Sequence, residues 1–130
     1  MHEAKKQKTI LIVEDDPVFL RALKDALSRE EFRIVQARDG KEGLDSALRE
    51  HPDLILLDIM LPVMDGVALL RALREDAWGK QAQVIILSNL NDDDKVAEIM
   101  TLGSYQYLVK SDHMIDEIVA SVKAKLDGIG

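Results

Sequence analysis

Short apolar runs alternate along this chain with longer stretches in which apolar residues recur every three or four positions. The runs have the length of strands, and the continuous ones are typical of strands buried on both faces of a parallel sheet. They lie at Thr9–Val13, Leu54–Leu57, Val84–Leu87 and Tyr107–Val109. A further run, Phe32–Gln36, mixes polar with apolar positions, so we expect it at an edge of the sheet.

Each stretch that follows a run has the spacing of an amphipathic helix, and its apolar set marks the face that we expect to be buried. The sets are Phe19, Leu23, Ala26 and Leu27; Leu44, Ala47 and Leu48; Leu69, Ala72 and Leu73; Val96, Ile99 and Met100; and Ile115, Ile118, Val119, Val122 and Leu126. Strand and helix thus alternate five times. This alternation predicts an α/β fold, (βα)5, in which one open, doubly wound parallel sheet carries helices on both faces.

Length and composition limit the classes of protein that fit. A chain of 130 residues has the size of one domain, and 47% hydrophobic with 32% charged residues is typical of a folded protein. We expect a flexible polar arm over residues 1–8, the domain over 9–127 and a frayed end over 128–130. The net charge of −7 argues against binding of DNA or RNA by this segment.

Cysteine is absent, which excludes disulfides, thiolate zinc sites and thiol nucleophiles. No apolar run approaches the roughly 18 to 20 residues that a membrane span needs, and the start of the chain lacks the apolar segment of a signal peptide. We therefore expect no membrane association and a cytoplasmic location.

Side chains suited to phosphoryl chemistry come directly after the predicted strands. Glu14 and Asp15 follow the first strand, Asp58 the third, Ser88 the fourth and Lys110 the fifth. Because the carboxyl ends of parallel strands share one edge of the sheet, we expect these residues to meet in one site.

Such a site has a consistent chemistry. Clustered carboxylates repel one another, and Mg²⁺ is the hard cation that carboxylates and phosphate oxygens share. An aspartate such as Asp58 can act as the nucleophile toward a phosphoryl donor. The ammonium of Lys110 can then offset the phosphoryl charge while the hydroxyl of Ser88 donates a hydrogen bond.

Taken together, these residues resemble the receiver domain of bacterial two-component response regulators, over nearly the whole chain. The motifs that carry the resemblance are Ile10–Asp16; Leu57–Gly66, which holds Pro62 and then Asp65-Gly66 at set distances after Asp58; and Ser88, Tyr107 and Lys110. The resemblance supports the flavodoxin-like strand order 2-1-3-4-5 with right-handed crossovers.

The resemblance also implies a role for each site residue. Asp58 would accept the phosphoryl group, Asp15 and Asp58 would bind Mg²⁺ directly, Glu14 would bind it through water, and the backbone carbonyl of Met60 would be a further ligand. Ser88 and Tyr107 would switch the face formed by the fourth helix, the fifth strand and the fifth helix. Tyr107 also fits the ordinary preference of aromatic residues for strands.

Partners follow from the same resemblance. The donor would be a phosphohistidine on a sensor histidine kinase or a histidine phosphotransfer protein, and the signal would pass to an output protein or domain, with phosphorylation-dependent dimerisation as one form of output. The chain would either act alone or be the receiver of a longer regulator. Two other functions compete with this one. A flavodoxin-like module binding flavin mononucleotide is disfavoured, because the carboxylates at Glu14–Asp16 would repel the flavin phosphate. A small hydrolase that uses aspartyl chemistry would need a substrate pocket and cap.

Two departures from the family pattern bear on the lifetime and geometry of the site. The resemblance implies that the residues two after the acceptor and two after the hydroxyl flank the approach of a hydrolytic water. Here these are Met60 and Leu90, neither of which binds water well, and Asn89 stands where the family usually has a small residue. We therefore expect slow hydrolysis. Lys110 is followed by Ser111 where the family commonly has proline, so a trans peptide bond is the ordinary expectation, with cis left open.

Some polar residues have simple structural readings. Asp16 before Pro17 is typical of a helix start, as is Asp65 before Gly66. The run Asp92–Asp94 suits the first turn of a helix. Trp78 is either an anchor of its loop or a contact for a partner.

Overall fold

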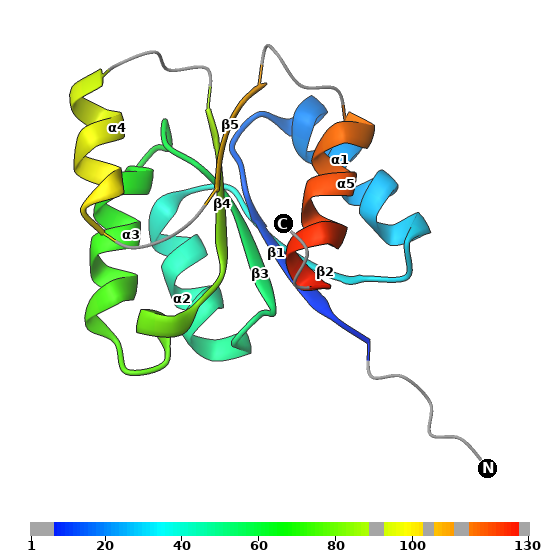
Figure 1. Ribbon diagram of the computed structural model, residues 1–130, viewed down its shortest axis with the longest axis horizontal. Coiled ribbons are helices and arrows are strands. Elements are labelled where there is room, and N and C mark those ends of the chain that lie inside the picture. The colour runs from blue at the N-terminus through cyan, green and yellow to red at the C-terminus, as the bar shows by residue number, and fades with distance from the viewer. Residues whose placement is uncertain (1–6, 89–92, 103–105, 111–114, 128–130) are drawn as a thin grey trace.

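A five-stranded, fully parallel sheet forms the centre of the molecule (Figure 1). The structure, a computed structural model, describes residues 7–88, 93–102, 106–110 and 115–127, with positions 88 and 93–96 as backbone. The strands are β1 (Thr9–Val13), β2 (Arg33–Ala37), β3 (Leu54–Asp58), β4 (Val84–Ser88) and β5 (Gln106–Val109). Their order in the sheet is β2-β1-β3-β4-β5, which confirms the predicted fold and strand order.

Helices cover both faces of the sheet. They are α1 (Pro17–Arg29), α2 (Gly40–Glu50), α3 (Gly66–Glu75), α4 (Asp93–Met100) and α5 (Ile115–Leu126), with a 3-10 turn, η1 (Gly79–Gln81), before β4. Figure 1 shows α1 and α5 on one face and α2, α3 and α4 on the other. None of the helices that the structure describes has the length and apolarity that a bilayer crossing requires.

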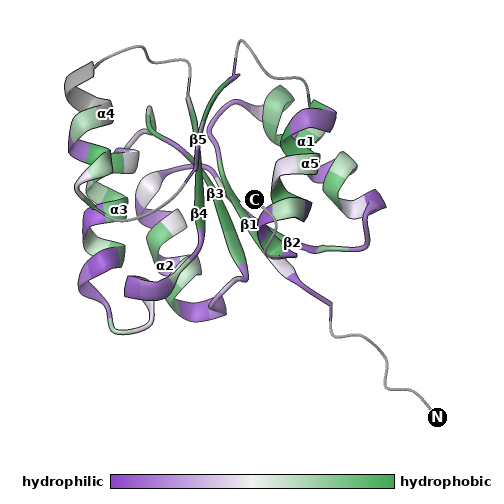
Figure 2. Cartoon of the chain, in the orientation of Figure 1, coloured by the Kyte–Doolittle hydropathy of each residue, from purple (hydrophilic) through white to green (hydrophobic). Residues whose placement is uncertain are grey.

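Alternate residues of each strand feed two separate hydrophobic cores. In β1, Leu11 and Val13 pack under α2 and α3, whereas Ile10 and Ile12 pack under α1 and α5. This is the two-residue period of a strand, and it explains why the central strands are apolar at every position. Figure 2 shows hydrophobic residues along the strands and hydrophilic ones on the outer sides of the helices. The edge position predicted for the strand that is observed as β2 is confirmed.

Among the described side chains of the predicted apolar faces, two are exposed and the prediction is wrong there. Leu48 in α2 is 37% exposed and Met100 at the end of α4 is 61% exposed. Helical spacing identifies the side of a helix, but burial also depends on what the neighbouring elements cover. In α2 the buried residues include the small Gly43, Ser46 and Ala47, of which only Ala47 belongs to the predicted apolar set.

Side-chain caps start the helices that follow β1 and β3. Asp16 accepts hydrogen bonds from the amides of Val18 and Phe19, with Pro17 as the first helical residue, and Asp65 accepts one from Ala68. Both readings of the sequence are therefore confirmed. The acidic run Asp92–Asp94 falls partly outside the described residues, so that reading stays a prediction.

Trp78 anchors its loop. Its indole stacks on the ring of His51 with centroids 4.3 Å apart and planes 7° from parallel, and its side chain packs against the core under α3. His51 ends α2 in a left-handed conformation (φ 46°). The stack therefore joins the loop after α2 to the loop after α3.

Gly66 allows α3 to begin directly against the end of β3. A β-carbon at this position would lie 2.4 Å from the carbonyl oxygen of Asp58 and 2.7 Å from the α-carbon of Ile59, both backbone atoms. The amide of Gly66 donates to the carbonyl of Ile59 at 2.8 Å. Because Gly66 has no side chain, the start of α3 can pack directly against the backbone of Asp58 and Ile59.

We predict that Gly66→Ala lowers the free energy of unfolding by about 2 to 4 kcal/mol, because either the helix or the end of β3 must shift. Urea denaturation of this variant and of Glu75→Ala, an exposed position at the other end of α3, gives the comparison. A loss for Gly66→Ala that is no larger than that for Glu75→Ala would contradict the close contact.

Candidate functional site

The register of the strands brings the predicted site residues to one edge of the sheet. Val13 lies opposite Leu57 in the β1–β3 pairing, so Glu14 leaves β1 beside the end of β3. Asp58 is opposite Leu87, one residue before Ser88. Ser88 is opposite Val109, one residue before Lys110. Asp58 and Ser88 are themselves the last residues of β3 and β4, so each strand ends one residue later than the sequence pattern predicted.

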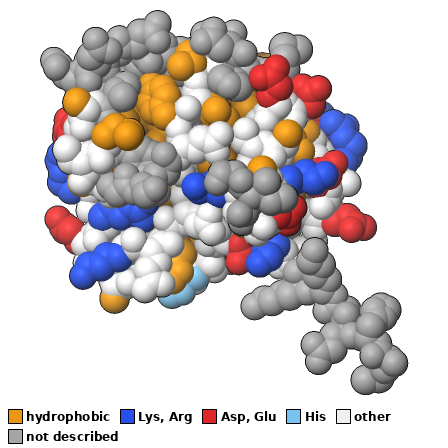
Figure 3. Space-filling view, viewed as in Figure 1, with side chains coloured by type: hydrophobic (Ala, Val, Ile, Leu, Met, Phe, Trp, Pro, Cys, Tyr) orange, Lys and Arg blue, Asp and Glu red, His pale blue; other side chains and the backbone are white. Residues whose placement is uncertain are grey.

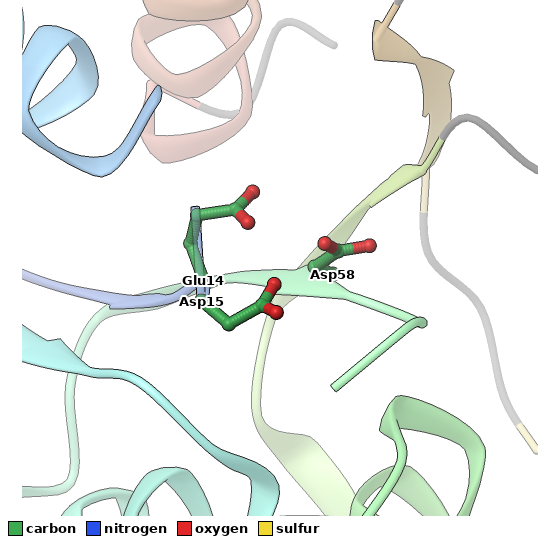
Figure 4. A group of neighbouring side chains, drawn as sticks. All are labelled: Glu14, Asp15 and Asp58. Carbon is green, nitrogen blue, oxygen red and sulfur yellow. The ribbon is translucent and has the colours of Figure 1, made fainter. Parts of the chain in front are cut away.

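Three carboxylates share this edge. Figure 4 shows Glu14 and Asp15 at the end of β1 and Asp58 at the end of β3, next to one another. Each offers an oxygen that lies within 4.8 Å of the other two. Glu14 and Asp58 are buried, at 2% and 6% exposure, whereas Asp15 is exposed. The cluster therefore has a closed side formed by two buried carboxylates and an open side at Asp15.

Lys110 supplies positive charge on the buried side. Its Nζ atom forms an ion pair with Oε1 of Glu14 and donates a hydrogen bond to Oδ2 of Asp58 at 3.1 Å. The lysine side chain is only 11% exposed. A single ammonium is thus shared by two buried carboxylates, and the third carboxylate nearby leaves an excess of negative charge.

Burial and these charges shift the pKa values of Glu14 and Lys110. Burial, and to a lesser extent the charge of Asp58, raise the pKa of Glu14 to about 7, although Lys110 and the amide of Asp16 act in the opposite direction. Burial alone would lower the pKa of Lys110, but its contacts with Glu14 and Asp58 outweigh that effect and raise it. The pocket therefore favours a charged lysine and disfavours ionisation of Glu14.

The carboxylate set fits a magnesium ion. Two oxygens bound to one Mg²⁺ at about 2.1 Å can be at most about 4.2 Å apart. The carboxylate oxygens here lie within 4.8 Å of one another, which is slightly more than this limit. Two of the carboxylates can therefore bind directly with a small adjustment, and the third can bind through a water that Mg²⁺ retains. A divalent cation would also remove the electrostatic cost of ionising all three.

The loop after β3 completes the surroundings of Asp58. The amide of Met60 donates a hydrogen bond to Oδ1 of Asp58 at 3.3 Å, while the side chain of Met60 is 60% exposed. The backbone of Met60 thus lies at the acceptor, and its carbonyl as a metal ligand stays a prediction. Further along the loop, Val63 adopts a positive φ of 69° and is 78% exposed.

One contributor to the site was missed from the sequence. The amide of Asp16 donates to Oε2 of Glu14 at 3.0 Å, so the residue that caps α1 also orients a buried carboxylate. A helix cap three residues after a strand end, and two after a candidate site carboxylate, is the signal that could have identified it.

The remaining predicted site residues lie on β4, on β5 and in the loops that follow them, and the structure describes them in part. The backbone of Ser88 ends β4 beside the site, but its side chain, with Asn89, Leu90 and the Lys110–Ser111 bond, lies outside the described residues. Tyr107 lies on β5 and packs, half-buried, against the core under α3. Its role as a switch stays a prediction.

Comparisons with known proteins agree with this geometry. Residues 10–123 match the family described as the response regulator receiver domain. Over 118 residues the chain is 42% identical to the transcriptional regulatory protein PrrA of Mycobacterium tuberculosis, which covers 90% of this chain and 49% of that protein. The chain therefore spans about half the length of the curated relatives it matches.

Solved structures show the same likeness. A CheY-like response regulator receiver domain protein from Methanospirillum hungatei aligns with a TM-score of 0.87 at 27% identity, covering 95% of this chain and 97% of that one. The receiver domain of a sensor histidine kinase from Pseudomonas aeruginosa, with a magnesium ion coordinated in its active-site cleft, aligns with a TM-score of 0.83 at 27% identity. That match covers 94% of this chain and 99% of the other.

The raised pKa of Glu14 predicts how stability depends on pH when no metal is bound. Because the folded pKa of about 7 lies above the ordinary 4.5, the folded chain holds this proton more tightly than the unfolded chain. The resulting stabilisation is complete below pH 4.5 and is lost as the pH rises through 7. A shift of this size corresponds to roughly 3 kcal/mol at most.

We therefore predict that, with a chelator present, Glu14→Gln has a higher free energy of unfolding than wild type at pH 8, and that the difference shrinks as the pH falls toward 5. Chemical denaturation across this range measures it, and Glu75→Gln serves as an exposed control. A difference between Glu14→Gln and wild type that does not change with pH would contradict the assignment.

Proposed function

Because the chain belongs to the response regulator receiver domain family, we propose that it is a phosphorylation-controlled signalling switch whose acceptor is Asp58. The observation that carries the proposal is the setting of this carboxylate. Asp58 stands at the carboxyl edge of the sheet, accepts hydrogen bonds from Lys110 and the amide of Met60, and shares a cation-sized space with Glu14 and Asp15.

In the proposed reaction, a carboxylate oxygen of Asp58 attacks the phosphorus of a phosphohistidine. The new O–P bond forms as the P–N bond to the donor breaks, which leaves an aspartyl phosphate and returns the electron pair to the imidazole. Lys110 already contacts Asp58, so its ammonium is in position to pair with the phosphoryl oxygens. Mg²⁺, when bound, would neutralise the carboxylates and the phosphoryl group together.

The hydroxyl of Ser88 is proposed as a donor to the phosphoryl group, because Ser88 ends the strand next to β3. Output would then pass through α4, β5 and α5, with Tyr107 as the aromatic switch. Two polar contacts link α3 to α4 and to the turn that follows α4. Arg71 forms an ion pair with Glu98, and Nε of Arg74 donates a hydrogen bond to the carbonyl of Leu102 at 3.0 Å. A movement of α4 would therefore have to break or rearrange these contacts with α3.

The proposed partners are a sensor histidine kinase or histidine phosphotransfer protein and an output protein or domain, in the cytoplasm. Direct nucleic-acid binding is not proposed for this segment, whose net charge is −7. On the face drawn in Figure 3, basic and acidic side chains are interspersed. Such a mixture does not form the basic surface that a phosphate backbone requires.

We predict that Asp58→Asn abolishes phosphorylation by acetyl phosphate and Mg²⁺ while the fold is retained. The amide is nearly isosteric with the carboxylate but is a poor nucleophile. Intact-mass spectrometry over time measures the phosphate adduct, and Asp25→Asn, an exposed aspartate on α1, controls for a general effect of losing a carboxylate. A phosphate-sized mass gain by Asp58→Asn at the wild-type rate would show that the acceptor lies elsewhere.

The residues beside Asp58 also bear on the lifetime of the phosphorylated state. Hydrolysis requires a water in line behind the phosphorus, and Met60 and Leu90 are the residues expected beside that path. The backbone of Met60 contacts Asp58 and its side chain is largely exposed, and a thioether offers an attacking water no strong hydrogen bond. We therefore propose that the aspartyl phosphate is comparatively long-lived.

The double variant Met60→Asn, Leu90→Glu should lose its phosphate roughly tenfold faster than wild type, equivalent to about 1.4 kcal/mol of barrier. Decay of the isolated phosphorylated proteins at fixed pH and Mg²⁺ concentration measures this. Met60→Leu is the matched control, because it keeps an apolar side chain and should decay at the wild-type rate. Equal or slower decay of the double variant would contradict the proposed role.

A further inference from the structure

An aromatic ring lies against the ammonium that serves the site. Nζ of Lys110 is 4.6 Å from the centroid of Phe19, which lies on the first turns of α1. The ring is half-buried and packs against the core under α1 and α5. From the sequence, Phe19 looked like an ordinary member of the apolar face of this helix, but its ring also meets a buried charge.

The distance and burial are those of a cation–π contact. A cation within about 6 Å of a ring centroid is attracted by the negative face of the ring, more strongly where water is excluded. Here the lysine side chain is 11% exposed, so much of the water that would weaken the attraction is absent. Glu14, Asp58 and Phe19 are thus three neighbours of one ammonium.

The three neighbours do not act alike during phosphoryl transfer. Glu14 and Asp58 carry negative charge and compete directly with an incoming phosphoryl group for the ammonium. A ring face attracts a cation without neutralising it and without forming a hydrogen bond that must later be broken. A flexible lysine stem can therefore be restrained near Asp58 while its charge stays free to pair with phosphoryl oxygens.

We propose that Phe19 is a positioning residue for phosphoryl transfer, which holds the Lys110 ammonium beside Asp58. The inference rests on the proposed function, because the benefit of a fixed ammonium appears when charge develops on the transferring group. The competing explanation is that Phe19 only fills space under α1. Any apolar side chain of similar size would then serve equally well.

Two substitutions separate these explanations. Phe19→Leu keeps apolar bulk but removes the ring, and Phe19→Tyr keeps the ring. If the contact exists, the ε-methylene protons of Lys110 are shifted upfield by the ring current in wild type and in Phe19→Tyr, and return toward ordinary lysine values in Phe19→Leu. Unshifted methylene protons in wild type would overturn the contact itself.

The kinetic test is a double-mutant cycle with acetyl phosphate and Mg²⁺. Phe19→Leu should slow phosphorylation about tenfold, equivalent to about 1.4 kcal/mol, and Phe19→Tyr should stay within about twofold of wild type. In a Lys110→Ala background, Phe19→Leu should cause no further loss, because the ammonium that the ring holds is gone. Phe19→Met repeats the test with another apolar side chain should the leucine variant not fold.

Several outcomes would overturn the positioning role. A wild-type rate for Phe19→Leu, or the same loss in both Lys110 backgrounds, would mean that Phe19 only fills space. These results are distinct from failure of the proposed function, in which the wild-type chain itself would gain no phosphate. That outcome would remove both proposals, whereas normal wild-type phosphorylation with an unaffected leucine variant would remove only this one.

Discussion

The ammonium of Lys110 lies between two buried carboxylates at the carboxyl edge of the sheet, and the rest of the site depends on this uneven pairing. One positive charge cannot balance Glu14, Asp58 and the exposed Asp15 together. Burial, with a smaller contribution from the charge of Asp58, raises the pKa of Glu14 to about 7 in spite of its contact with Lys110. A divalent cation would balance the pocket, and a phosphoryl group would give Lys110 a new partner. The unbalanced charge is therefore the basis on which we propose that the pocket takes both ligands.

The fold holds this charge in place with apolar strands and close backbone contacts. Every residue of β3 is buried, including Asp58 at its end, and the start of α3 packs directly on that end through Gly66. The same edge in a flavin-binding protein of this architecture would have to accept the phosphate of the flavin. Carboxylates at Glu14 and Asp15 would repel it, so the charge of the edge, and not the fold, separates these functions.

Sequence patterns predicted the strands, their layers and the meeting of Glu14, Asp15, Asp58 and Lys110, because continuous apolar runs and strand ends are local features with a fixed consequence in a parallel sheet. The strand order depended partly on the family resemblance. Burial of Leu48 and Met100 was predicted wrongly, since periodicity does not reveal what covers a helix. The contacts of Lys110 with Glu14 and Phe19 could not be predicted, because they depend on the path of a flexible side chain.

The central claim is that the three carboxylates form one cation site around the phosphoryl acceptor. The most direct test is a titration of the chain with Mg²⁺ while backbone amide chemical shifts are recorded, in wild type and in Asp15→Asn. We predict saturable shifts in wild type that centre on Glu14, Asp15 and Met60 and are strongly weakened in the variant. Equal, non-saturating shifts at exposed carboxylates such as Asp45 and Asp116, with no change caused by Asp15→Asn, would contradict the account.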